Sequence, residues 1–187
     1  MIIRPRTPAD QAEIETLIAR CFPPARRRRT AELLRGRSQP LPGLAFVAVG
    51  DGRVLGSVAC HPVRWEGPGG VRPLLLLGPL VADPDRRGEG IGLALMARAV
   101  EALDAAGADS MLIGDAPYYG RFGYGAEATG GWRLPGPVEP ERLLLRARDP
   151  ALWAGPATVT PATGAAGSTV LPAPAAGPVG WGGRTAA

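Results

Sequence analysis

The hydrophobic positions recur with different spacings along the chain, and each spacing predicts a type of element. Residues 2–7 open with an apolar pair that predicts a short strand. Residues 7–22 then repeat apolar side chains at helical spacing, with Ile14 and Ile18 on one face, and Pro8 suits a first helical turn. The chain therefore begins with a strand followed by an amphipathic helix.

Two further apolar stretches predict a β-hairpin. They cover residues 44–50 and 53–65 and are joined by Asp51 and Gly52, a dipeptide that favours the tight turn between two strands. Before them, a polar segment predicts a second, solvated helix that starts near Thr30. The first third of the chain is thus expected to pair its strands in antiparallel fashion.

The longest apolar run, residues 71–84, is typical of a central strand buried on both faces. It contains Gly78 and Pro79, and a proline cannot donate to a strand ladder. This pair predicts a bulge, or a place where neighbouring strands part. The following residues, 91–106, repeat apolar side chains as a helix does and end at a glycine.

Shorter strands are expected at residues 110–114, 131–135 and 141–149. The order of elements predicts a mixed α/β fold, with antiparallel pairing early and a strand-helix-strand crossover later. We expect one domain over residues 1–155 and a poorly ordered tail over residues 156–187, because the end of the chain is rich in Ala, Gly and Pro.

The charge balance does not by itself identify a partner. The chain has 21 basic and 17 acidic side chains, and a basic balance allows a nucleic-acid binder as one hypothesis. All the basic residues are arginines, however, as a GC-rich coding sequence produces, and the run from Arg26 to Arg29 lacks interleaved aromatic residues. That run is interpreted either as a solvated helix start or as one lip of a substrate groove.

Cysteine usage and hydropathy exclude several other classes. Cys21 and Cys60 are far apart, which indicates neither a disulfide framework nor a metal site, and we expect both thiols to be reduced in the cytoplasm. No secretory leader is evident, and no apolar run is long enough to cross a bilayer.

Three glycines stand where the helix over residues 91–106 should begin. Gly88, Gly90 and Gly92 each weaken a helix by about 1 kcal/mol relative to alanine. Glycines let backbone amides approach a ligand closely, and the unpaired N–H groups at a helix start attract anions. The spacing fits neither a dinucleotide fingerprint nor a P-loop, which requires a lysine that this chain lacks.

The segment Arg87-Gly88-Glu89-Gly90-Ile91-Gly92 matches the Arg/Gln-x-x-Gly-x-Gly/Ala signature of the GNAT superfamily of N-acetyltransferases. A second segment, Tyr118 to Tyr124, is similar to the aromatic motif near the end of that fold. Together with "LGPLVADPDRRGEGIG", it resembles the small bacterial YhbS-like branch, and the resemblance covers Ile2 to Trp153. It implies a twisted, mostly antiparallel sheet with a splayed central strand and flanking helices.

The resemblance also implies the roles of particular residues. Acetyl-CoA is the co-substrate, no metal is needed, and the acceptor is an amine of a small molecule or peptide. Tyr119 aligns with the tyrosine that protonates the departing thiolate, and the Val81 N–H with the group that polarises the thioester oxygen. The cofactor-binding residues that it implies are Leu80, Val81, Ala82, Arg86, Arg87, Gly88, Glu89, Gly90, Ile91 and Gly92.

Several questions stay open from the sequence. The general base is His61, Asp83, Asp115 or a water molecule, and Glu89 is expected to face solvent. Trp132 either lines the acceptor groove or belongs to the core. A CoA-binding module that has lost catalysis is the alternative function, and homodimers are common among the family's members.

Overall fold

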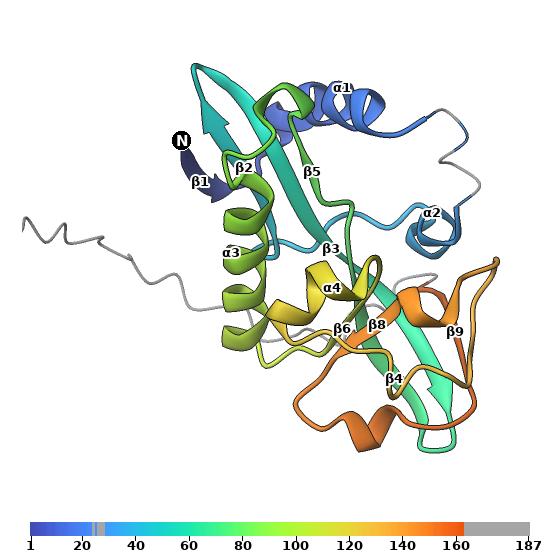
Figure 1. Ribbon diagram of the computed structural model, residues 1–187. Coiled ribbons are helices and arrows are strands. Elements are labelled where there is room, and N and C mark those ends of the chain that lie inside the picture. Colours follow the sequence, from blue (N-terminus) through green and yellow to red (C-terminus); the bar gives the residue numbers. More distant parts are fainter. Residues whose placement is uncertain (24, 26–28, 163–187) are drawn as a thin grey trace, which may run out of the picture.

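The computed structural model describes residues 1–23, 25 and 29–162, and one long strand, β3, organises it (Figure 1). The strands are β1 (Ile2–Pro5), β2 (Ala45–Gly50), β3 (Arg53–Gly67), β4 (Gly70–Leu77), β5 (Val81–Ala82), β6 (Ser110–Ile113), β7 (Trp132–Arg133), β8 (Leu143–Arg146) and β9 (Ala157–Pro161). The helices are α1 (Gln11–Cys21), α2 (Thr30–Arg35), α3 (Ile91–Ala105) and α4 (Ala116–Tyr119).

Within these residues, nine strands form one mixed sheet in which β1, β2, β3, β4, β6 and β8 are successive neighbours. The pairings are antiparallel except β4 with β6 and β7 with β9. The first half of β3 pairs with β2 and β5, and its second half pairs with β4 and β9. The predicted mixed, mostly antiparallel fold is confirmed.

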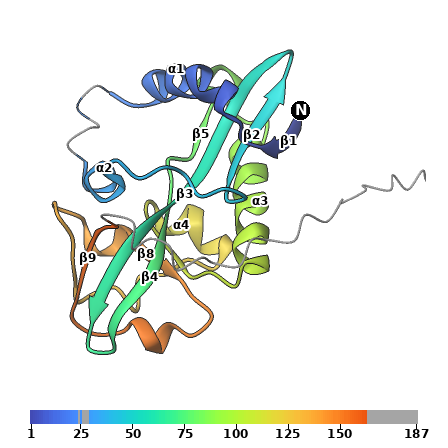
Figure 2. The same ribbon diagram turned by 180° about the vertical axis from the view of Figure 1, so that it is seen from behind.

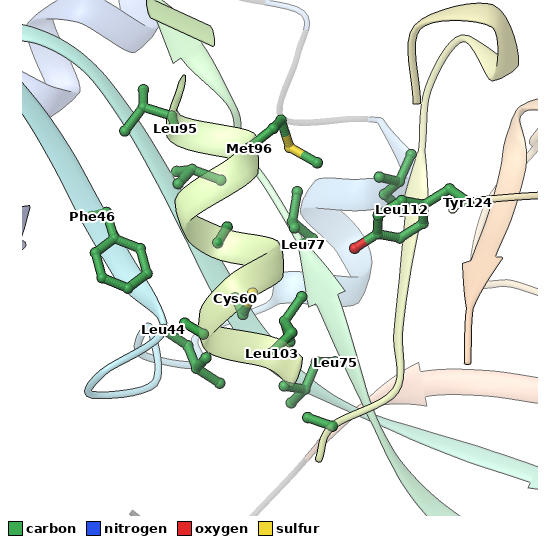
Figure 3. Packing of buried hydrophobic residues seen from close by; sticks show 14 of the residues in the cluster. Leu44, Phe46, Cys60, Leu75, Leu77, Leu95, Met96, Leu103, Leu112 and Tyr124 are labelled. Atoms are coloured by element: carbon green, nitrogen blue, oxygen red, sulfur yellow. The ribbon is translucent and has the colours of Figure 1, made fainter. Parts of the chain in front are cut away.

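The two longer helices cover opposite faces of the sheet. Adjacent residues of a strand point to opposite faces, and on β2 Phe46 packs in the cluster that holds Leu95 of α3, whereas Val47 packs with Ile14 of α1. Figure 3 shows Phe46, Leu95 and Leu103 within the larger cluster. The apolar spacing of both predicted helices therefore reflects burial against the two faces.

A separate cluster fills the far half of the sheet and lies between β3, β4 and the late strands. Trp65, Trp132 and Trp153 meet there, with the Trp65 and Trp153 rings 5.3 Å apart in an edge-to-face arrangement. Trp132 is buried and donates its indole N–H to the Trp153 carbonyl at 3.0 Å. Of the two interpretations left open for Trp132, the core role is the one observed.

The predicted central strand is divided in two by a bulge. Gly78 donates its N–H to the Ala59 carbonyl at 2.8 Å, and Val81 pairs with Ser57. From Ala59 to Ser57, β3 advances by two residues, whereas its partner advances by three, from Gly78 to Val81. One extra residue is therefore inserted beside Pro79, which has no N–H to donate. Beta4 ends before the bulge and β5 begins after it.

The bulge coincides with the point where β4 and β6 separate. Their last paired residues are Leu76 and Met111. Beyond them, β4 continues along β3 into the bulge, while β6 continues toward α4 (Figures 1 and 2). The splayed strand expected from Gly78 and Pro79 is thus present, and it opens a gap at the carboxyl ends of both strands.

The end of the described chain differs from the prediction. Beta9, residues Ala157–Pro161, pairs with Val63 to Glu66 of β3, although a tail was expected from residue 156. Val159 is fully buried in the tryptophan cluster, and this packing outweighs the local composition. Arg26 to Arg28 and residues 163–187 lie outside the described residues. None of the helices in the described ranges is long and apolar enough to cross a membrane.

Candidate functional site

The glycine turn connects β5 to α3 and takes a shape that requires glycine. Gly88 and Gly90 have φ values of +93° and +73°, a region that other residues rarely adopt. No atom lies within 4 Å of the position that a Cβ would take at either residue, so this side of the turn is open. The glycines therefore serve the backbone shape and not helix stability.

In the described part of the chain, no side chain caps the start of α3. Its N-cap, Gly90, provides no side-chain hydrogen bond, and the first turn holds no acidic residue. The Ala94 N–H donates to the Gly90 carbonyl at 2.9 Å, which leaves the amides of Ile91 to Leu93 ahead of the helical ladder. With the positive end of the helix dipole, these amides form a site suited to an anion.

The charged residues of the turn divide into paired and free groups. Arg86 bonds to Asp51 of the β2–β3 turn and to Glu89 at 3.2 Å, so its cationic group is already engaged. Glu89 is exposed, as expected. Arg87 is exposed as well, and among the described residues no carboxylate pairs with it. Of the two predicted cationic residues, Arg87 is the one left free for a phosphate.

Asp83 links the glycine turn to α1 and β3 through its carboxylate. Its buried carboxylate accepts the Asp85 N–H at 3.2 Å and pairs with Arg20 at 3.2 Å and Arg53 at 2.8 Å. Burial opposes ionisation, but the amide and the two guanidinium groups outweigh it, and the pKa of Asp83 is lowered. A carboxylate held in this way ties α1, β3 and the turn together and is poorly placed to accept a proton.

The ladder between β3 and β5 corrects the expectation for Val81. The Asp83 N–H donates to the Leu55 carbonyl at 2.8 Å, toward β3. Successive amides of a strand point in opposite directions, so the Val81 N–H also points toward β3, where this residue pairs with Ser57. The N–H that points to the open edge belongs to Ala82. Val81 is therefore poorly placed to polarise a thioester oxygen.

Neither cysteine acts as an activated nucleophile in this arrangement. The Cys21 thiol donates to the Ala82 carbonyl at 3.3 Å, and burial raises its pKa. Cys60 is fully buried beneath α3, and burial raises its pKa to about 12. Both thiols therefore stay protonated at neutral pH. The described residues also contain no cluster of side chains that could hold a metal ion.

A cavity of about 910 Å³ lies where β4 and β6 separate. Its floor is formed by the bulge, residues 77–80, and by the end of β6, residues 112–115. One wall comes from α2 and the residue before it, and another from the loop that ends in the 3₁₀ turn Pro140–Arg142. Residues 137–139 and 142, which follow the aromatic motif, thus line this cavity, and the prediction that they form one wall of the acceptor groove stays a prediction.

Tyr119 lies at this cavity, at the end of α4. It is half-buried, and its ring meets that of Tyr118 edge to face at 4.8 Å. Burial raises the pKa of Tyr119 to about 12, with Tyr118 and Asp115 adding to the effect and Arg142 opposing it. The phenol is therefore protonated at neutral pH and can donate a proton or a hydrogen bond into the cavity.

Asp115 also lines the cavity, but its carboxylate is paired. Arg142 lies 2.8 Å from it and reaches Glu139 at 3.5 Å. On the opposite wall, Arg35 pairs with Glu32 at 2.9 Å. Among the three residues proposed as base, Asp115 is the one that the cavity contains.

His61 lies outside the cavity lining and is buried. Its Nδ1 is 3.2 Å from the carbonyl oxygen of Ser38 and 3.2 Å from its hydroxyl. Burial and, to a lesser extent, the nearby Arg35 lower the pKa of His61 to about 4. The imidazole is thus neutral and packed, which suits a structural role and not proton transfer at the cavity.

The sequence motifs did not identify four charged residues of the cavity: Glu32, Arg35, Glu139 and Arg142. Each lies on a short element whose place depends on distant contacts. The Thr30 hydroxyl of α2, for example, donates to the Pro137 carbonyl at 2.6 Å and joins the two walls. No local spacing in the sequence carries this information.

Comparisons with known proteins agree on one family. The sequence profile of the acetyltransferase (GNAT) domain matches residues 2–126. Among solved structures, a GNAT family N-acetyltransferase (YhbS) from Escherichia coli in complex with CoA is 26% identical, with a TM-score of 0.67. That match covers 84% of this chain and 88% of the other.

A GNAT family acetyltransferase from Brucella melitensis in complex with acetyl-CoA is 30% identical, with a TM-score of 0.54. This match covers 79% of this chain and 96% of the other. No curated protein matches the chain.

Proposed function

Because the chain belongs to the GNAT family of acetyltransferases, we propose that it moves the acetyl group of acetyl-CoA to a primary amine held in the cavity beside Tyr119. The observation that carries this proposal is the continuity of the two parts of the site. The bulge at residues 77–80 forms the cavity floor, and β5 leads from it directly to the glycine turn.

The residues present fit acetyl-CoA as a co-substrate. Its pyrophosphate would meet the free amides at the start of α3 and the exposed Arg87. Its pantetheine arm would run along the open edge of β5, where the Ala82 N–H points away from β3. CoA and acetyl-CoA in the two related structures support this assignment.

The transfer proceeds by direct attack in a ternary complex. The neutral amine nitrogen attacks the acetyl carbonyl carbon, an amide bond forms, and the carbon–sulfur bond breaks. The amine loses one proton and the departing thiolate gains one, so the products are the acetylated amine and CoA. Tyr119 is proposed as the donor to the sulfur, since its phenol faces the cavity and keeps its proton at neutral pH.

The proton lost by the amine has two possible acceptors at this cavity. Asp115 is a carboxylate on its wall, although it is already paired with Arg142. A water molecule is the other, and it requires no dedicated side chain. Replacement of Asp115 by Asn separates them, because only the first route loses a proton acceptor.

Tyr119→Phe tests the proposed function. Loss of a general acid lowers a rate by about 100-fold or more, so we expect kcat to fall to that extent while the KM for acetyl-CoA changes little. The matched control is Tyr124→Phe, because the Tyr124 hydroxyl is bonded to Ser110 in the core at 2.7 Å and lies outside the cavity. Release of the CoA thiol with a panel of amines provides the measurement.

The pH profile adds a second readout. Because the pKa of Tyr119 is raised to about 12, kcat of the natural protein should show no fall centred near pH 10, where an unperturbed tyrosine titrates.

Binding of acetyl-CoA without turnover of any amine would contradict the proposal and favour the alternative, a CoA-binding module without catalysis.

A further inference from the structure

The cavity beside Tyr119 has an uneven distribution of charge. Its six charged residues belong to two of its walls. The α2 wall consists of Arg29, Glu32 and Arg35, and the Tyr119 wall consists of Asp115, Glu139 and Arg142. The α2 wall thus has one excess arginine, and the Tyr119 wall has one excess carboxylate.

The pairing within each wall leaves these excess charges available. On the α2 wall, Glu32 pairs with Arg35, while among the described residues no carboxylate pairs with Arg29, whose guanidinium lies over the Phe22 ring at 5.6 Å. The buried Nε of Arg35 has no hydrogen-bond acceptor in the described part of the chain. A buried donor without a partner costs free energy unless a ligand satisfies it.

The Tyr119 wall has the opposite character. Arg142 is shared between Asp115 and Glu139, so one cation serves two carboxylates. Both acidic side chains are exposed. An ammonium group that approaches the acetyl carbonyl beside Tyr119 would be attracted to this wall before it loses its proton.

We infer that the acceptor is an amine that also carries a carboxylate, with the amine directed to the Tyr119 wall and the carboxylate to Arg29 and Arg35. This inference rests on the proposed function and narrows it to one class of substrate. Arginine recognises carboxylates through two parallel hydrogen bonds, which suits the unpaired guanidinium of Arg29 and the free Nε of Arg35. The volume of about 910 Å³ leaves room for such a molecule next to the thioester.

Acceptor pairs that differ only in the carboxylate test this inference. Amino acids with one to five methylene groups between amine and carboxylate are compared with the amides of the same length, at fixed acetyl-CoA and low salt. We expect kcat/KM for the best acid to exceed that of its amide by about tenfold or more, the usual effect of one charge-assisted hydrogen bond. The chain length at which the preference is largest would give the span between the walls.

Arg29→Ala should lower this acid-to-amide ratio toward one. Arg37→Ala is the matched control, because Arg37 is also exposed, lies just beyond α2 and does not line the cavity. Arg37→Ala also removes one positive charge, but it should leave the acid-to-amide ratio of kcat/KM unchanged. Arg35→Gln is a second variant, and a thermal midpoint close to that of the natural protein shows that it has folded.

The outcomes separate the two proposals. If amides and acids are acetylated equally well, the inference about the acceptor is wrong and the proposed function stands. A ratio that survives in both Arg29→Ala and Arg35→Gln also overturns the inference. If acetyl-CoA binds but neither kind of acceptor is acetylated, the proposed function itself fails, and the inference fails with it.

Discussion

The glycine turn and the cavity are the two halves of the proposed site, and they are built in different ways. The turn lies within a single stretch, Asp83 to Gly92, and its shape follows from glycines with positive φ and from an uncapped helix start. The cavity is assembled from α2, the ends of β4 and β6, and a late loop. A local motif can therefore predict a cofactor site, whereas the residues proposed to select the acceptor are brought together only by the tertiary fold.

The largest effect is expected at Gly90. Gly90→Glu forces a side chain into a positive φ and places a negative charge at the anion site. We expect the variant to lose the stabilisation that acetyl-CoA gives, which for the natural protein is about 2.7 kcal/mol at 100 times the dissociation constant. Thermal unfolding with and without acetyl-CoA is the measurement.

Gly70→Glu provides the control for strain. Gly70 has φ +89° at the start of β4, and its Cβ would also meet open space. This variant should keep the shift in thermal midpoint. If Gly90→Glu keeps it as well, the glycine turn is not the phosphate site, and the distinction between the two halves loses its basis.

An intermediate effect is expected at Asp83, which links the turn to the rest of the fold. Asp83→Asn leaves Arg20 and Arg53 without their shared carboxylate. We expect the KM for acetyl-CoA to rise about tenfold while kcat stays within about twofold, because the turn is displaced and the cavity is not. Steady-state kinetics with acetyl-CoA varied would check this, and a fall in kcat alone would contradict it.

The same variant has a defined pH signature. The pKa of Asp83 is lowered in the folded protein, so its carboxylate stabilises the fold above the unfolded pKa of about 3.9. That contribution disappears as the pH falls through the lower, folded value. The difference in stability between the natural protein and Asp83→Asn should therefore shrink in acid.

The smallest effect on activity is expected at His61. His61→Asn retains a polar group near Ser38 and should leave the rate within about twofold, because the imidazole lies outside the cavity. A large fall in kcat would contradict this prediction and support His61 as the general base.

Its effect on stability depends on pH. The folded pKa is about 4, and the unfolded value is about 6.5, so the unfolded chain binds a proton first as the pH falls between them. The natural protein should lose up to roughly 3 kcal/mol relative to His61→Asn over that range. Denaturant unfolding at several pH values measures this difference.

The elements with strong local signals could be predicted from the sequence. Asp51 and Gly52 form the hairpin turn with φ values of +52° and +72°, and Gly78 with Pro79 marks the bulge. Beta9 could not be predicted, since its alanine, threonine and proline residues resemble those of a tail. Its place depends on β3 and the buried tryptophans, which are distant in sequence.

For the candidate site, the division between local and distant signals is similar. The position of Tyr119 at the cavity agrees with the aromatic motif. The direction of the Val81 amide could not be predicted, because the extra residue in the bulge decides which amides face the open edge. The register depends on how two strands pair, so the sequence of one strand alone does not determine it.

The length of β3 has a consequence for how the molecule folds. This one strand of 15 residues pairs with β2 and β5 at one end and with β4 and β9 at the other. If the partners of one end of β3 unfold, the backbone groups of that end lose their hydrogen bonds. Because the other end belongs to the same strand, its pairings are weakened as well. The glycine turn and the tryptophan cluster should therefore melt in a single cooperative transition, and the many pairings between distant segments favour slow refolding.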